Sequence, residues 1–302
     1  MPSGILLLDK PRGLSSNAVL QRVRTLFLRQ KAGHVGSLDP LATGMLPICL
    51  GEATKIAGQI LAGRKRYRFT VALGSATATG DAEGAVTTTA PVPPFDRAAL
   101  EALLARFRGP QTQTPPMYSA VKRAGQPLYK LARAGVTVAR AARAIELFEL
   151  TLRALAPASL ELEALCSKGT YIRVLAEDLA AALGTCGHVT ALRRLYVEPF
   201  EKEPMHTLES LAETRARGDW PRLLSSDWPL GHLTAVRLTA SEAQRMLSGQ
   251  SVMAQVAGAA AAVRLYDEAG TFLGLGEADG RGAVRPRRLL SLSALSLSAR
   301  AP

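Results

Sequence analysis

Cysteine and long apolar runs are scarce in this sequence. Three cysteines stand among 302 residues; they form no C-x-x-C pair and leave one thiol over, which argues against a disulfide framework and against structural zinc. No apolar run approaches the ~20 residues that a membrane span needs, and the start lacks a cationic leader. No Walker loop or correctly spaced dinucleotide fingerprint occurs. We therefore expect a cytoplasmic, soluble protein with no metal, no nucleotide cofactor and no membrane contact.

Acidic residues are also few, and one long window has none. The formal net charge is +12, which favours a polyanionic partner such as nucleic acid. Tyr118 and Tyr129 lie in this acid-free window, which runs from residue 102 to residue 145, and Pro and Gly interrupt any long helix there. This composition is typical of an irregular RNA-contacting surface with stacking groups. Its basic residues are Arg106, Arg108, Lys122, Arg123, Lys130, Arg133, Arg140 and Arg143.

Three smaller basic clusters occur elsewhere, within residues 22–31, 64–68 and 281–288. Any one of them alone is readily explained as solvated surface charge. Together with the acid-free window, they favour an RNA-binding protein.

The apolar patterning predicts an α+β protein. Hydrophobic residues make up 47% and charged residues 21%, as in ordinary globular chains. Tyr67, Phe69 and Val71 alternate with polar residues as in a strand, residues 171–183 have helical spacing, and Ser16 is expected to cap a helix that runs through Arg29. Because strands and helices mix without a regular βαβ rhythm, α+β is the better class.

A composition shift suggests where the chain divides. Prolines and both tryptophans punctuate residues 201–230, and residues 263–274 fit two strands around a turn. We expect one large domain over residues 1–230, a small β-rich domain over residues 231–290 and a flexible tail over residues 291–302.

One glycine-rich stretch could carry chemistry. Gly33, Gly36 and Gly44 surround a single acid, Asp39, and tight turns of this kind can present a carboxylate from a loop. Asp followed by Pro40 is also an ordinary helix N-cap with proline at the first helical position. Spacing alone leaves both interpretations open.

Two further residues have the same ambiguity. Arg173 stands between a predicted strand and a predicted helix, where it could grip a carboxylate with two parallel hydrogen bonds or simply pair with Glu177 one turn on. Tyr67 begins a strand among four cations, where it could stack on a base or pack in the core with Phe69.

Several motifs resemble the TruB family of tRNA pseudouridine synthases. The longest is GHVGSLDPLATGMLP at residues 33–47, preceded by LDKPRG at residues 8–13. In chain order there follow GEATK (51–55), KRY (65–67), GD (80–81), PMYSA (116–120), CSKGTYIR (166–173) and LRR (192–194). The matches extend from residue 4 to about residue 200, and the end of the chain is similar, more weakly, to the PUA-like domain of bacterial members.

The resemblance implies a fold and an activity. The fold is a mixed, mainly antiparallel sheet domain of pseudouridine synthase type, with a basic RNA-contacting insertion at about residues 110–143. The activity is isomerisation of uridine 55 in the tRNA T loop by base flipping, without a cofactor. Asp39 would be the catalytic aspartate, Arg173 its partner and Tyr67 the group stacked on the uracil, while His34 would occupy space left by the flipped nucleotides.

The resemblance also implies the partner, a tRNA held by its T-arm and elbow, and we expect the protein to be a monomer. Ser37 stands where many members have Ala, and Gly80 and Glu83 vary the polar run around Asp81. Besides His34, the residues assigned to RNA binding are Lys10, Asp81, Tyr118, Lys122, Arg123, Lys130, Lys168, Tyr171 and Arg193.

Pseudouridine formation needs no redox step and no hydrolysis, so one carboxylate at the electron-poor C1′ suffices. Whether Asp39 attacks C1′, attacks the base or assists glycal formation stays open. The alternatives are a non-catalytic RNA-binding or ribosome-associated protein, a base-excising glycosidase, and a deaminase, whose His/Cys zinc signature is missing.

Overall fold

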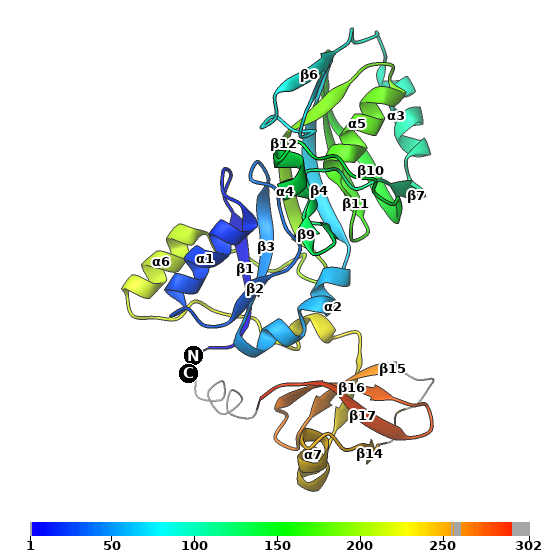
Figure 1. Ribbon diagram of the computed structural model, residues 1–302. Helices are drawn as coiled ribbons and strands as arrows, with labels where there is room; N and C mark the ends of the chain where they lie inside the picture. Colours follow the sequence, from blue (N-terminus) through cyan, green and yellow to red (C-terminus); the bar gives the residue numbers. More distant parts are fainter. Residues whose placement is uncertain (1, 255, 257–260, 292–302) are drawn as a thin grey trace.

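The computed structural model describes residues 2–254, 256 and 261–291 of the chain. Two larger sheets, one of eight strands and one of five, organise these residues (Figure 1), and two two-stranded sheets accompany them. Nearly all neighbouring strands are antiparallel and helices are interspersed, which confirms the predicted α+β class. No helix in these residues is long and apolar enough to cross a membrane.

The large sheet contains the first strand of the chain at one edge. Its strands in spatial order are β1 (Gly4–Lys10), β3 (Thr43–Leu50), β12 (Gly187–Val197), β4 (Lys65–Leu73), β11 (Ser159–Cys166), β10 (Arg143–Ala156) and β7 (Gly109–Gln113), with β2 (Ala32–His34) also paired to β3. β12 and β3 run parallel and pair at only two positions, whereas β12 pairs with β4 along its length. This short contact joins the two halves of the sheet.

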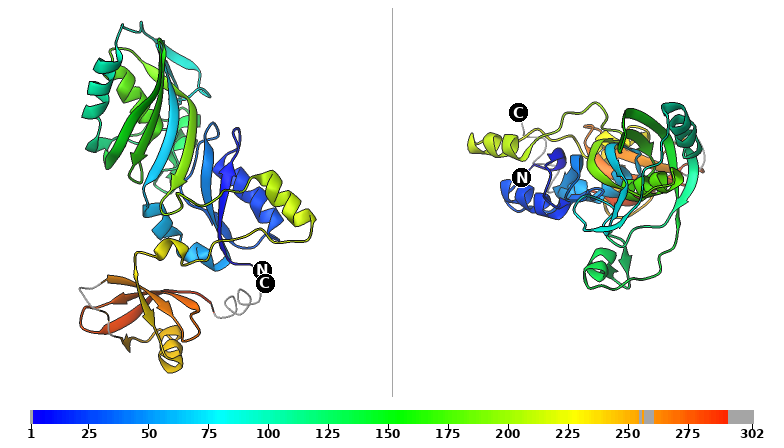
Figure 2. Two further views of the ribbon diagram at one scale, coloured as in Figure 1. Left: turned by 180° about the vertical axis from the view of Figure 1, so that it is seen from behind. Right: turned by 90° about the horizontal axis from the view of Figure 1, so that it is seen from above.

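The alternation in β4 decides which face of the sheet is buried. Tyr67, Phe69 and Val71 enter the main core, and Arg66 and Arg68 point to the opposite face. Two helices, α3 (Arg97–Arg106) and α5 (Ile172–Ala182), contribute leucines to that core and lie on the same side of the strands (Figures 1 and 2). The strand predicted from Tyr67 onward is thus confirmed.

A second layer covers the other half of the sheet. Helices α1 (Ser16–Leu26) and α6 (Leu208–Ala216) pack against β1 and β3 in a separate apolar cluster. The predicted cap and end of α1 were wrong by a few residues. Ser15 is the N-cap and accepts from the backbone of Ala18, and the helix ends before Leu28 and Arg29, whose φ angles of 52° and 55° are left-handed.

Short elements link these layers. The basic segment, residues 110–143, holds only short elements, so the expected irregular surface is observed; its α4 is six residues long. The connecting elements are η1 (Gly51–Lys55), α2 (Ala57–Ala62), β5 (Ser75–Thr77), β6 (Val86–Thr89), β8 (Lys122–Arg123), β9 (Gln126–Pro127), α4 (Leu128–Arg133) and η2 (Trp228–Leu230).

The five-stranded sheet forms a smaller unit with its own apolar core. Its strands in order are β13 (Thr234–Arg237), β15 (Ala261–Tyr266), β16 (Phe272–Ala278), β17 (Ala283–Leu289) and β14 (Val252–Met253), with helix α7 (Ala240–Leu247). The strand pair expected within residues 263–274 is present as β15 and β16. A domain boundary at residue 230 stays a prediction, and the predicted tail lies, after residue 291, outside the described residues.

Candidate active site

Asp39 lies on a loop between β2 and β3 whose backbone is held by hydrogen bonds from buried side chains. The buried Lys10 Nζ donates to the main-chain oxygens of Pro40 (3.2 Å) and Ala42 (2.6 Å). On the other side, the Ser16 hydroxyl exchanges two hydrogen bonds with the backbone of the residue before Asp39. Residues 40–42 form a turn and no helix, so Asp39 is not an N-cap. The backbone on both sides of the carboxylate is therefore held by buried polar groups.

Arg173, in the first turn of α5, grips the Asp39 carboxylate. Its Nε lies 2.8 Å from Oδ2 and its Nη2 lies 3.3 Å from Oδ1. The guanidinium also donates to the main-chain oxygens of Thr79 and Tyr118, and it is only 4% exposed. The guanidinium thus faces Asp39 and not Glu177, and the forked geometry fixes the carboxylate in orientation.

Opposing effects set the charge of Asp39. Burial raises the pKa of its carboxyl group, and the nearby Asp81 raises it further, whereas Arg173 and Lys10 lower it. The net direction is upward, although 38% of the side-chain surface stays accessible. Asp39 is therefore a partly desolvated carboxylate whose ionised form depends on Arg173.

Tyr67 lies in the main core beside the Asp39 loop. Its side chain is 8% exposed and belongs to the same apolar cluster as Leu38 and Leu41, which flank Asp39. Burial raises the pKa of its phenol, and the positive charge of Arg194 opposes that effect. Core packing is what the structure shows for this ring, and stacking on a base stays a prediction.

Two predicted RNA contacts are corrected by burial. Lys10 is fully buried, and burial lowers its pKa to about 8 although Asp39 acts in the opposite direction. Asp81 is also buried, accepts from the Thr79 hydroxyl and lies 3.7 Å from Arg173 Nε. Both side chains are occupied in holding the Asp39 and Arg173 pair, so neither reaches an RNA in this structure.

The other predicted RNA-binding residues are accessible to different degrees. His34, on β2, is half-buried; its Nδ1 has no hydrogen-bond partner among the described residues, and burial lowers its pKa. Arg193 forms an ion pair with Asp9 at 2.7 Å and is 39% exposed. Lys122, Arg123, Lys130 and Lys168 are exposed, and Tyr118 and Tyr171 are half-buried.

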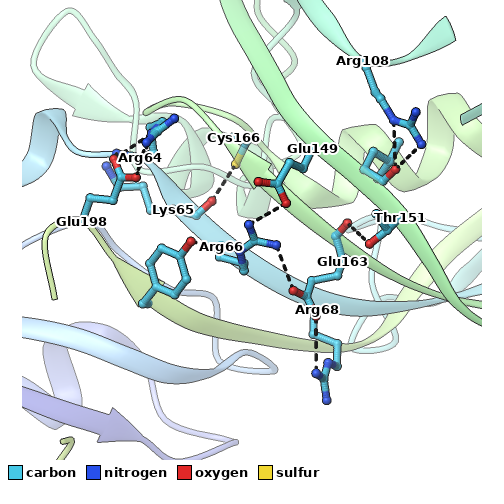
Figure 3. A network of polar contacts seen from close by, with 12 residues as sticks. Arg64, Lys65, Arg66, Arg68, Arg108, Glu149, Thr151, Glu163, Cys166 and Glu198 are labelled. Atoms are coloured by element: carbon cyan, nitrogen blue, oxygen red, sulfur yellow. Dashed lines mark hydrogen bonds and ion pairs between the residues drawn. The ribbon is translucent and has the colours of Figure 1, made fainter. Parts of the chain in front are cut away.

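The basic cluster at residues 64–68 is not a free cationic surface. Glutamates that are distant in sequence form ion pairs with its arginines on the outer face of the sheet (Figure 3). Glu163, on β11, is 5% exposed and accepts from Arg66 at 3.0 Å and Arg153 at 2.9 Å. Lys65 is buried and donates to the main-chain oxygen of Leu61. These cations are thus paired within the protein, and RNA binding by this cluster stays a prediction.

The basic cluster near the end of the chain borders a cavity. A half-open space of about 320 Å³ lies between residues 54–59 on one side and β16 and β17 on the other. Lys55, Arg287 and Arg288 line it, and Lys55 Nζ also donates to the main-chain oxygen of Leu289 at 2.9 Å. This site can accept an anionic group.

Two buried polar residues near the site were not assigned a role from the sequence. The Gln113 side chain, 3% exposed, both donates to and accepts from the backbone of Tyr171 and so fixes the start of α5. Arg194 is 1% exposed and lies beneath the Asp39 loop. Gln113 lies in a basic window and belongs to no motif, whereas Arg194 belongs to the LRR motif at residues 192–194, in which only Arg193 was assigned a role.

Three family profiles match the chain. One, described as "TruB family pseudouridylate synthase (N terminal domain)", matches residues 24–172. A second, "tRNA pseudouridylate synthase B C-terminal domain", matches residues 173–224. A third, "Pseudouridine synthase II TruB, C-terminal", matches residues 234–290.

Curated relatives match over nearly their whole length. A protein of Chromohalobacter salexigens named tRNA pseudouridine synthase B is 50% identical over 295 residues, which is 97% of this chain and 96% of that protein. A protein of the same name from Aromatoleum aromaticum is 50% identical over 95% of this chain and 92% of its own length.

Solved structures share the fold at low sequence identity. One, of an H/ACA RNP bound to a substrate RNA, has a TM-score of 0.73 and 19% identity over 97% of this chain and 86% of that chain. A Cbf5–Nop10–Gar1 complex has a TM-score of 0.71 and 21% identity over 95% of this chain and 84% of that chain. These neighbours confirm the predicted fold type.

Proposed function

Since the chain belongs to the TruB family of pseudouridine synthases, we propose that it isomerises uridine 55 in the T loop of tRNA, with Asp39 as the catalytic carboxylate. Membership makes the chain an isomerase, and its relatives are named for tRNA. The observation that supports the assignment of Asp39 is the buried Arg173 guanidinium, which holds this accessible carboxylate by two nitrogens. Such a pairing keeps an acid ionised and aimed in a partly desolvated site.

The reaction needs few groups. The C1′–N1 bond breaks, the uracil turns, C5 joins C1′, and the C5 proton leaves while N1 gains one. A carboxylate can support or attack the electron-poor C1′ without activating a water. A single acid held by Arg173 is therefore sufficient for the carbohydrate half of the chemistry.

Tyr67 is proposed for the base half. Its ring lies beside the two leucines that flank Asp39, so a uracil that reaches Asp39 would also meet the small exposed part of the ring. Stacking would hold the detached base, and the phenol oxygen could take the C5 proton.

We assign tRNA binding to the basic segment and to the cationic cavity. Lys122, Arg123, Lys130 and Arg133 are exposed, and none of them forms an ion pair within the described residues. A uridine in the folded tRNA elbow must be flipped out before Asp39 can reach it, so these cations would hold the T-arm while it opens. All of the groups used in this proposal come from one chain, so we propose that the protein acts as a monomer, in the cytoplasm.

The test is direct. Purified protein is incubated with unmodified tRNA transcript without added cofactor, and position 55 is analysed for pseudouridine. Wild type should convert it; Asp39→Asn should bind tRNA with similar affinity and convert none. Asp96→Asn, which keeps an N-cap on α3, is the matched control and should be active.

Three outcomes would contradict the proposal. Conversion by Asp39→Asn would remove Asp39 from its role. Tight tRNA binding without conversion by wild type would favour the alternative of a non-catalytic RNA-binding protein, and release of free uracil would indicate a glycosidase.

A further inference from the structure

Arg194 stands where the two halves of the large sheet meet. Across one side of β12 it pairs with Tyr67 of β4, and across the other side it pairs with Gly44 of β3. Residues directly opposite in an antiparallel pair place their side chains on the same face. A register irregularity follows directly between Arg194 and Tyr196, and such bulges re-aim side chains. Arg194 is thus next to β4, which carries Tyr67, and next to β3, which follows the Asp39 loop.

The Arg194 side chain closes the base of that loop. Its Nε donates to the main-chain oxygen of Met45 at 2.7 Å, and its Nη2 donates to that of Gly36 at 2.9 Å. These carbonyls lie at the two ends of residues 36–45, the segment that contains Asp39. The Arg194 guanidinium therefore holds the two ends of the Asp39 loop at a fixed distance from each other.

The neighbouring glycines are required by this arrangement. A Cβ on Gly44 would stand 2.1 Å from the Arg194 main-chain oxygen, and its φ of +98° disfavours other residues. A Cβ on Gly36 would lie 3.3 Å from Arg194 Nη1. The motif glycines on both sides of Asp39 are thus fitted around this arginine.

The charge of Arg194 has no acidic partner within ion-pair distance in the part of the chain that the structure describes, although the side chain is 1% exposed. Two further buried cations, Lys10 and Lys65, lie near enough that Arg194 contributes to lowering their pKa values, after burial itself. Burying an uncompensated charge costs free energy. An apolar side chain would fill this core with less cost, so the positive charge needs an explanation beyond packing.

We propose that Arg194 is a positioning residue that holds the Asp39 loop at a fixed distance from Tyr67 and places a permanent positive charge beside the Tyr67 phenol. The inference rests on the proposed function. Once C5 has joined C1′, the C5–H bond breaks and its proton moves to the ionised phenol oxygen. The electron pair forms the C5–C6 double bond, and the pair released from the C6–N1 double bond goes to N1, which takes a proton. The phenol must first lose its own proton to solvent. Burial opposes this loss, and the fixed cation of Arg194 offsets part of that cost.

The test compares Arg194→Met, which removes the charge, with Arg194→Lys, which keeps it but cannot reach both carbonyls. Arg153→Met, on the outer face of the sheet, is the matched control. Arg194→Met should lower kcat by roughly 10²-fold, the loss typical of one electrostatic group, with KM and tRNA affinity within about threefold of wild type. Arg194→Lys should recover part of kcat, and Arg153→Met should keep wild-type kcat.

A double variant shows whether Arg194 acts through Tyr67. If it does, Arg194→Met combined with Tyr67→Phe should be no more than about threefold slower than the slower single variant. Losses that multiply, or equal losses in Arg194→Met and Arg194→Lys with a matching fall in melting temperature, would overturn the proposal in favour of a purely structural role. Should Arg194→Met fail to fold, Arg194→Lys alone decides, because near-complete loss of kcat with retained charge contradicts the inference. Wild-type protein that forms no pseudouridine would instead refute the proposed function.

Discussion

Arg173 binds Asp39 with two nitrogens, and the same guanidinium donates to the main-chain oxygens of Thr79 and Tyr118. Three segments distant in sequence therefore meet at one buried cation: the Asp39 loop, the turn after β5 and the basic segment. Because Tyr118 lies in the segment assigned to RNA binding, the Arg173 guanidinium contacts both the Asp39 carboxylate and the segment proposed to bind RNA.

Arg173→Lys keeps the charge but loses the forked geometry. We expect kcat to fall by roughly 10²-fold with tRNA affinity little changed, measured by single-turnover pseudouridine formation and filter binding. Arg97→Lys, in an exposed ion pair with Glu101 on α3, is the control and should be fully active. Wild-type turnover by Arg173→Lys would mean that the two hydrogen bonds to Asp39 do not matter for the reaction.

The pH profile should report on Asp39. Burial raises its pKa, so the carboxylate becomes protonated at a higher pH than the ordinary ~3.9 of aspartate, and activity should fall as the pH falls through this raised value. In Arg173→Lys one opposing effect is weakened, so the acidic limb should move to still higher pH. The measurement is kcat/KM against pH, with tRNA binding followed over the same range. A limb that stays at the same pH in both proteins would assign it to another group.

Salt dependence locates the RNA. Each phosphate contact contributes roughly 0.7 to 0.9 to the negative slope of log K against log salt concentration. Replacing Lys122, Arg123, Lys130 and Arg133 together by Gln should make that slope less negative, by the contribution of about two to four phosphate contacts. The control replaces Arg64 and Arg68, which are held by glutamates, and should leave the slope unchanged. Equal slopes in all three proteins would place the RNA elsewhere.

Patterns of neighbouring residues predicted the structural features that depend on interactions close in sequence. The alternation of Tyr67, Phe69 and Val71 gave a strand and its buried face, because side chains on a strand point alternately to two sides. Ser15 and Ser16 show the limit of this reasoning. Either serine can cap a helix. Ser15 is the cap because the Ser16 hydroxyl is hydrogen-bonded to the backbone of Leu38, which lies 22 residues further along the chain.

Charge patterns failed where the partners are distant in sequence. The cluster at residues 64–68 looked cationic, since Glu149 of β10, Glu163 of β11 and Glu198, just after β12, are brought close only by the fold. Lys10, which the family resemblance assigned to RNA binding, also has partners that are distant in sequence. Its carbonyl partners at Pro40 and Ala42 are 30 or more residues away, and no sequence pattern marks a main-chain oxygen.

The outer-face cluster predicts a stability effect separate from activity. Glu163→Gln removes the buried acid shared by three arginines and should cost about 1–3 kcal/mol of unfolding free energy, with pseudouridine formation unchanged. Burial disfavours the charge of Glu163, but hydrogen bonds from Arg153 and Arg66 outweigh it and lower its pKa. The stabilisation is therefore present above the ordinary glutamate pKa of ~4.3 and should fade as the pH falls below it.

The control for Glu163→Gln lies two residues away on the same face. Glu161→Gln removes a 40% exposed carboxylate that is 3.9 Å from Arg68, and surface pairs of this kind contribute little. Denaturant melts of the three proteins at neutral and acidic pH are the measurement. Equal losses for both variants would mean that Glu163 is no more important than a surface charge.

Tyr67→Phe separates stacking from proton removal. Phe keeps the ring and so most of the ~1–3 kcal/mol that base stacking can supply, but it lacks the phenol oxygen. If Tyr67 takes the C5 proton, the Phe variant should bind tRNA normally and stall after the glycosidic bond has broken, whereas Tyr67→Leu should also hold the base less well. A tRNA carrying 5-deuterouridine tests the step, because any isotope effect should grow in the Phe variant when deprotonation becomes limiting. Normal turnover by Tyr67→Phe without an isotope effect would leave Tyr67 as a stacking platform only, and it would also remove the basis for a charge on Arg194 beside the phenol.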